Sequence, residues 1–272
     1  MRKISSFIGV PGVFVCILSV LCLITSGCKQ GQQPANGATA STAQTPQQTV
    51  ASQASPAHIP FVGCPADGQA GPVAAPPDKD MVINLPADSA SKLACYGVGS
   101  FGVLAPRGWH CFETYGSDGS NLFVAPDPIN SASLLSANWG GFTGPAIQVS
   151  YSSSDTSGRF AVAQVIARVF PAHMAFVKQV EAEGIESSKD FPVGPYPADT
   201  LNSNGDVVEF TTPANQDGLG TASSLKKNGS PITGVAILRL SKEVLVQLSI
   251  RLPGGAEPLG PVIIHELESE TK

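Results

Sequence analysis

The sequence has few charged residues and no cluster of basic ones. Of its 272 residues, 16 are Lys or Arg and 21 are Asp or Glu, and they are scattered along the chain. Proteins that bind nucleic acids neutralise phosphates with a dense basic patch, which this sequence lacks. We therefore expect no nucleic-acid partner.

The short motifs that mark common catalytic and metal sites are also missing. The four histidines, at positions 58, 110, 173 and 265, are not spaced as metal ligands, and the sequence contains neither HExxH nor CxxC. The Gly-x-Ser-x-Gly motif of serine hydrolases is absent as well. We therefore assign no catalytic residue, no metal site and no cofactor from the sequence.

Long hydrophobic runs are missing except at the N-terminus. There, two basic residues precede an apolar run from about Ile8 to Ile24, and small residues follow it up to Cys28. This order is typical of a secretory signal peptide, which we predict over residues 1–27.

The end of this segment, "ITSGC", resembles the lipobox of bacterial lipoproteins. The resemblance implies cleavage after Gly27 and acylation of Cys28, so that a lipid would anchor the mature chain to a membrane. It also implies export across the inner membrane. Because Lys29 follows the cysteine, the resemblance favours the outer membrane, with the domain in the periplasm or at the cell surface. The alternative is an ordinary signal peptide cleaved nearby, which leaves Cys28 a plain thiol.

Residues 28–60 are rich in Gln, Ala, Ser, Thr and Pro and contain almost no large apolar side chain. Such a composition cannot bury enough surface to fold, so we predict a disordered tether. The remaining residues, 61–272, are numerous enough to form one domain with a sizeable core.

Three cysteines fall within this domain. Outside the cytoplasm, three thiols predict one disulfide and one unpaired cysteine. We predict the pair Cys64 and Cys111, because Cys64 lies in the loop-like "VGCPADG", whereas Cys95 lies in the apolar "KLACYG" and can be buried as a small hydrophobic residue. Cys95 with Cys111 is the alternative.

Hydrophobic periodicity predicts an α+β domain, with a mostly antiparallel sheet and one long kinked helix packed on it. The helix is predicted over residues 157–184, where apolar residues recur every three or four positions and Pro171 breaks or kinks the helix. A shorter helix is predicted over 86–97. Residues 101–126 are typical of a three-strand meander, with turns at 106–108 and 116–120.

Two hairpins are predicted in the C-terminal half. Asn204–Gly205 favours a tight turn. In the second hairpin, residues 231–253, we expect Leu238 to lie opposite Val246 on a continuous apolar face, with a partly solvated face behind it. Residues 253–272 are compatible with a short helix or an edge strand.

The segment "APRGWHC", residues 105–111, is interpreted as a rigid turn with Arg107 exposed at its tip. Together with the residues after it, this segment resembles a stretch of uncharacterised secreted bacterial proteins, from which no activity follows. Arg107 and Trp139 are the candidate surface contacts. Trp139 belongs to one of three loops, at 116–121, 138–145 and 215–221, whose residues suit a carbohydrate or peptide contact as well as ordinary turns.

These features favour a lipid-anchored envelope protein whose domain acts as a binding or structural module, with an envelope protein or a polysaccharide as the candidate partner. One alternative is a hydrolase of an envelope polymer, for which the nominated residues are Arg107, His110, Asp118 and Asp217. The other is an assembly subunit that pairs through an exposed sheet edge, such as the outer strand of the C-terminal hairpin.

Overall fold

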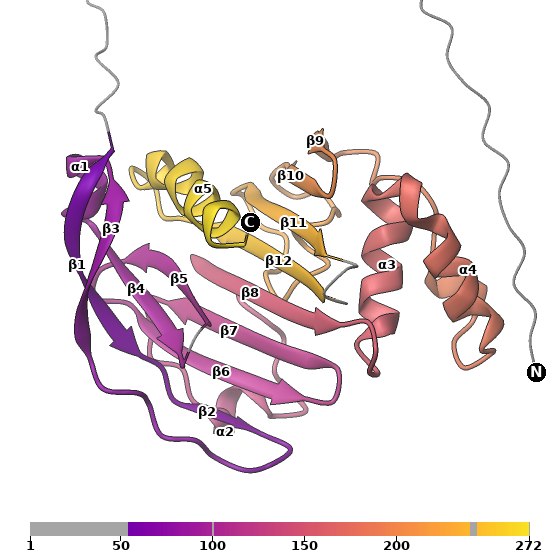
Figure 1. The fold of residues 1–272 in the computed structure, drawn as a ribbon, viewed down its shortest axis with the longest axis horizontal. Coiled ribbons are helices and arrows are strands. Elements are labelled where there is room, and N and C mark those ends of the chain that lie inside the picture. Colours follow the sequence, from indigo (N-terminus) through magenta and orange to yellow (C-terminus); the bar gives the residue numbers. More distant parts are fainter. Residues whose placement is uncertain (1–53, 100, 240–243, 272) are drawn as a thin grey trace, which may run out of the picture. The chain divides into compact units, whose positions relative to one another are not determined.

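The structure is a computed structural model that describes residues 54–99, 101–239 and 244–271. The predicted signal peptide, Cys28 and most of the predicted tether lie outside these residues. The described part contains two β-sheets and five α-helices and belongs to one compact unit (Figure 1). The predicted α+β class is therefore confirmed.

The smaller sheet has four strands, which are in spatial order β3 (Lys79–Leu85), β1 (Ser55–Gly63), β4 (Leu93–Val98) and β5 (Phe101–Pro106). The strand β1 begins at Ser55, so the last residues of the predicted tether belong to the folded domain, where Ile59 is fully buried. Residues 55–60 pair with β3 alone, because β4 pairs only with residues 61–63. An edge of this kind tolerates prolines, which lack an N–H donor.

The larger sheet has eight strands, which are in spatial order β2 (Ala66–Gly68), β6 (His110–Gly116), β7 (Gly119–Ala125), β8 (Ala146–Ser153), β12 (Val244–Arg251), β11 (Ile232–Arg239), β10 (Val207–Thr212) and β9 (Thr200–Asn204). Each sheet is mixed, because β1 runs parallel to β4 and β2 runs parallel to β6. The expectation of a single, mostly antiparallel sheet is thus corrected.

The predicted three-strand meander is divided between the two sheets. The strands β6 and β7 form the expected hairpin, but β5 pairs with β4, and residues 107–109 carry the chain from one sheet to the other. The buried Tyr96 hydroxyl holds this crossing. It donates a hydrogen bond to the Pro106 carbonyl (2.9 Å) and accepts one from the Trp109 N–H (3.0 Å).

The helices are α1 (Ala87–Ala90), α2 (Ser131–Leu134), α3 (Arg159–Val169), α4 (Met174–Ala182) and α5 (Gly260–Glu270), with short 3-10 turns at Pro171–His173, Ser188–Asp190 and Glu257–Leu259. The predicted long helix is broken at the 3-10 turn that contains Pro171, as its missing N–H requires. The helix predicted over 86–97 is wrong beyond Ala90. Residues 93–97 are all buried, and they form a central strand between β1 and β5 instead.

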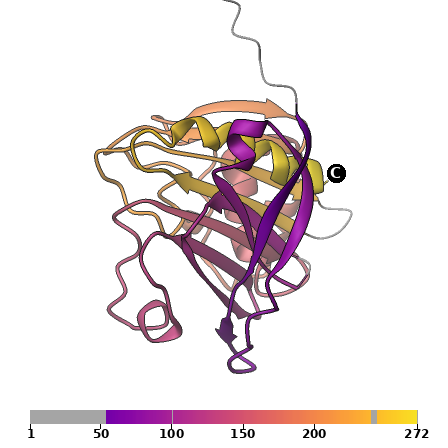
Figure 2. The same ribbon diagram turned by 90° about the vertical axis from the view of Figure 1, so that its left-hand side faces the viewer.

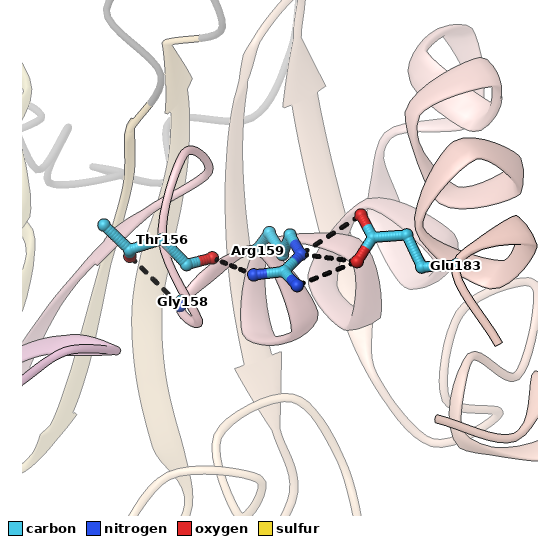
Figure 3. Close-up of polar contacts among 4 residues, drawn as sticks. All are labelled: Thr156, Gly158, Arg159 and Glu183. Carbon is cyan, nitrogen blue, oxygen red and sulfur yellow. Dashed lines mark hydrogen bonds and ion pairs between the residues drawn. The ribbon is translucent and has the colours of Figure 1, made fainter. Parts of the chain in front are cut away.

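An ion pair ties the two halves of the broken helix together (Figure 3). Arg159 opens α3, and its guanidinium lies 2.8 Å from the carboxylate of Glu183, which follows the end of α4. The same guanidinium donates to the Thr156 carbonyl (2.7 Å). The start of α3 is therefore fixed both to α4 and to the loop that precedes it.

The eight-stranded sheet is the middle layer of the described unit. We call the side that packs on the four-stranded sheet and α5 its inner face, and the side that carries α3 its helix face (Figures 1 and 2). Buried side chains of the inner face are Cys111, Leu122, Val124, Ile147, Val149, Val235, Ile237, Val246, Leu248 and Ile250. The helix α5 contacts β5 of one sheet and β11 of the other, and so closes this core.

The tight hairpin predicted at Asn204–Gly205 is present, with Gly205 and Asp206 in its turn. The C-terminal hairpin is shifted by one residue from the predicted register, because Leu238 lies opposite Leu245 rather than Val246. Its apolar side chains are divided between two buried faces. A hydrophobic pattern defines strand register only where one face of the strand is buried and the other is solvated. Because both faces are buried here, the pattern did not define the pairing, and the predicted register was wrong by one residue.

The predicted disulfide between Cys64 and Cys111 is present, with 5.3 Å between the two Cα atoms. It joins the residue that follows β1 to β6 and therefore links the two sheets. Cys95 is a buried free thiol, and burial raises its pKa to about 12. Disulfides are typical of proteins that fold outside the cytoplasm.

Candidate functional site

A cavity of about 510 Å³ lies over the helix face of the eight-stranded sheet, where polar side chains replace the apolar ones. We call it the helix-face cavity. Its floor consists of alternate side chains of three adjacent strands, β7, β8 and β12, namely Asn121, Gln148, Ser150, Ser152, Leu245 and Gln247. The helix α3 forms one wall, and loops form the rest of the rim.

The centre of the floor is a hydrogen-bonded network of three side chains. The Gln148 amide donates to Asn121 Oδ1 (2.8 Å) and to Ser150 Oγ (2.9 Å), and the Ser150 hydroxyl donates to the same Asn121 oxygen (2.7 Å). Gln148 Oε1 accepts the backbone N–H of Ser224 (2.7 Å), a residue of the rim. Because these bonds fix the side chains, the floor presents polar atoms at defined positions.

A buried arginine fastens two segments of the rim, loop 138–145 and residues 220–226 of the connection between β10 and β11. The Arg251 side chain is 2% exposed, and its guanidinium donates to the carbonyls of Phe142 (3.3 Å), Gly144 (3.2 Å) and Lys226. Burial lowers the pKa of this guanidinium, which nonetheless stays charged because arginine titrates so far above neutrality. Backbone bonds between Phe142 and its neighbours Ser224 and Lys226 join the two loops directly.

The earlier part of the same connection, residues 215–221, is fixed from beneath by Asp199 and Thr212. The Asp199 carboxylate accepts the N–H of Leu219 and the hydroxyl of Thr212, each at 2.7 Å, and Thr212 Oγ1 accepts the N–H of Gly220 (3.0 Å). A side chain at Gly218 would place its Cβ only 2.0 Å from the Asp199 carboxylate, so this approach requires glycine.

Two aromatic residues stand at the walls. Trp139 is half-buried and packs edge-on against Phe123 and Phe142, with ring centroids 5.6 Å and 5.4 Å away. Elsewhere in the lining, the Arg168 guanidinium lies over the Tyr196 ring at 4.1 Å and donates to the Gly194 carbonyl (3.1 Å). Both aromatic side chains are therefore held in one orientation.

All three loops singled out in the sequence contribute to this lining, through residues 118–121, Trp139 with Gly141, and Leu219. Arg107 lies elsewhere. It is exposed, but its guanidinium donates to the carbonyls of Ala90 and Leu93, both at 2.9 Å. Its role in the structure is to fasten α1 to the start of β4.

The four residues nominated for a hydrolase are not assembled. Asp118 lines the cavity, whereas His110 lies at the opposite end of β6, about 20 Å away at the rise of a β-strand. Asp217 is 71% exposed and pairs with Lys227 (2.8 Å). The second carboxylate of the lining, Asp190, accepts the backbone N–H of Ser187 (3.1 Å) in a helix cap.

The C-terminal hairpin does not provide a sheet edge, because β12 lies between β8 and β11, and β11 pairs with β10. The outer strands of the eight-stranded sheet are β2 and β9. Within the described ranges, no three His, Cys, Asp or Glu residues are grouped as metal ligands, and no helix is long and apolar enough to span a membrane.

Sequence reasoning missed Gln148, Ser150, Gln164, Arg168 and Lys226, which all line the cavity. The signal for two of them lies in β8, where polar Gln148 and Ser150 alternate with apolar Ile147 and Val149. The chain matches no protein-family model, and no curated protein and no solved structure shows significant similarity to it. The chemistry of the cavity therefore has to be argued from its own residues.

Proposed function

We propose that this chain is a lipid-anchored envelope protein whose domain binds a small polar ligand in the helix-face cavity. Acylated Cys28 would anchor it at the outer membrane, and the predicted tether would hold the domain away from the lipid surface. The disulfide between Cys64 and Cys111 supports a position outside the cytoplasm.

One observation carries the binding role. Two segments of the rim, 138–145 and 215–226, are fastened by polar side chains beneath them, namely Arg251, Gln148 and Asp199. Burying polar groups costs free energy unless they are fully bonded, and an ordinary turn does not need them. Buried polar side chains that hold loops in place are typical of a binding site, where the atoms that contact a ligand must be fixed.

Binding of a set of small polar compounds to the purified full-length protein is measured by ligand-observed NMR. The variant Gln164→Trp places a large ring on the α3 wall of the cavity and should abolish binding. The control is Gln179→Trp, an exposed position of α4 outside the lining. If both variants bind like the unchanged protein, or if no compound binds, the proposed function is wrong.

The anchor is tested separately with Cys28→Ala, which should move the protein from the membrane fraction to the soluble fraction. Incorporation of a labelled fatty acid into the unchanged protein, and its loss in the variant, should accompany this shift. Unchanged fractionation would refute acylation at Cys28.

A further inference from the structure

The positive and negative side chains that line the helix-face cavity are equal in number. Two cations, Arg168 and Lys226, and two anions, Asp118 and Asp190, line it. Arg168 is already engaged by the Tyr196 ring and the Gly194 carbonyl. An excess of positive charge favours a phosphate or a carboxylate ligand, and this lining does not offer such an excess.

The floor is neutral and can both donate and accept hydrogen bonds. Within the described residues, Asn121 Nδ2 makes no hydrogen bond, so its two donors are available. Gln247 donates to the Leu219 carbonyl (3.3 Å), while its own carbonyl oxygen has no donor in the same part of the chain. A ligand that matches such a floor carries several groups that donate and accept at once, as hydroxyl groups do.

The wall adds an apolar surface next to these polar groups. The indole of Trp139 is fixed by Phe123 and Phe142, and it lines the same cavity as the amides of the floor. A rigid aromatic ring beside convergent donors and acceptors suits a molecule with both an apolar C–H face and a hydroxylated rim.

An extended peptide fits less well. Peptides that bind to sheets add a strand at an exposed edge, where main-chain groups are unpaired. The cavity lies over β7, β8 and β12, each of which pairs with a neighbour on both sides. Binding of a peptide by strand addition is therefore excluded at this floor.

We infer that the ligand of the helix-face cavity is a neutral saccharide, with Trp139 as its stacking platform and Asn121 and Gln247 as its hydrogen-bonding groups. This inference rests on the proposed function and gives its ligand a chemical class. An envelope provides such ligands as polysaccharides or as free sugars, and the experiment separates the two.

The test is a glycan array that carries neutral and charged oligosaccharides, followed by calorimetric titration of the full-length protein with each soluble hit and its monosaccharide. We expect neutral oligosaccharides to bind, with an affinity that changes less than about twofold between low and high salt. Trp139→Ala should weaken binding at least about tenfold, and Trp139→Phe, which keeps an aromatic ring, should restore most of it. Equal affinity for the monosaccharide identifies a free sugar, and tighter binding of the longer chain identifies a polysaccharide.

Binding of charged compounds alone, with strong salt dependence and loss in Lys226→Ala, would overturn the saccharide but leave the proposed function intact. Saccharide binding that is unaffected by Trp139→Ala would overturn the site. Absence of binding by every glycan would overturn the inference. In that case, comparison of the unchanged protein with Gln164→Trp, using the set of small polar compounds, shows whether the cavity binds another ligand.

Discussion

The two faces of the eight-stranded sheet are built from the same strands but differ in chemistry. On the inner face, Leu248 and Ile250 of β12 pack into a continuous apolar core. On the helix face, the intervening positions of the same strand are Gln247, Ser249 and Arg251. At these positions β12 therefore stabilises the core of the inner face and holds the loops of a site on the helix face, beside the second apolar core that packs under α3.

The largest loss of stability is expected from removal of the disulfide, which joins the two sheets on the inner face. Removing it with Cys64→Ala and Cys111→Ala should cost about 4 kcal/mol, because the bond closes a long loop in the unfolded chain. Urea denaturation measures the loss. The control Cys95→Ala keeps the disulfide and should cost about 1 kcal/mol. Equal losses in both would contradict the role assigned to the bond.

A direct comparison of the faces uses two neighbouring residues. Leu248→Ala empties part of the inner core and should lower the free energy of unfolding by about 3 kcal/mol. Ser249 is equally buried, but its hydroxyl has no hydrogen-bond partner among the described residues, so Ser249→Ala should change stability by less than about 0.5 kcal/mol. The same denaturation series checks both variants, and a large loss in the second would show that the faces do not differ in this way.

The helix face is most sensitive at Arg251. Arg251→Met leaves three loop carbonyls without their donor and should cost about 2 kcal/mol. The distinguishing readout is amide hydrogen exchange, which should accelerate in loops 138–145 and 220–226 and not in the inner strands. Arg239→Met, at the end of β11, is the matched control. Uniform acceleration throughout the domain would refute a local anchoring role.

The smallest effect concerns a carboxyl group on the inner face. Burial raises the pKa of Glu113 above its ordinary value of 4.5, although a hydrogen bond from Ser120 opposes this shift. The native chain therefore holds the proton more tightly than the unfolded chain, and stability falls as pH rises from about 4.5 through the raised native pKa. Glu113→Gln should flatten this decline in urea titrations at several pH values, whereas Asp127→Asn, an exposed carboxyl, should not. Parallel pH profiles for the unchanged protein and Glu113→Gln would contradict this assignment.

The parts of the fold that depend on local chemistry could be predicted. Pro171 breaks its helix because it lacks an N–H, and Gly205 turns a tight hairpin because it adopts a positive φ. The disulfide could be predicted from the contrast between the surroundings of Cys64 and Cys95. Two elements could not. No Gly or Pro separates α1 from the strand at 93–98, so local signals do not mark where the helix ends. The register of the C-terminal hairpin depends on which of two buried faces each residue meets.

For the site, the sequence alone determined the materials: three polar loops and polar residues at alternate positions of β8. It did not determine that these loops and side chains lie around one cavity. Asn121, Trp139 and Leu219 are separated along the chain, and only the order of strands β7, β8 and β12 and the anchors beneath the loops bring them around one cavity. The physical reason is that local propensity acts between near neighbours in sequence, whereas a binding site depends on contacts that form only when the whole sheet is assembled.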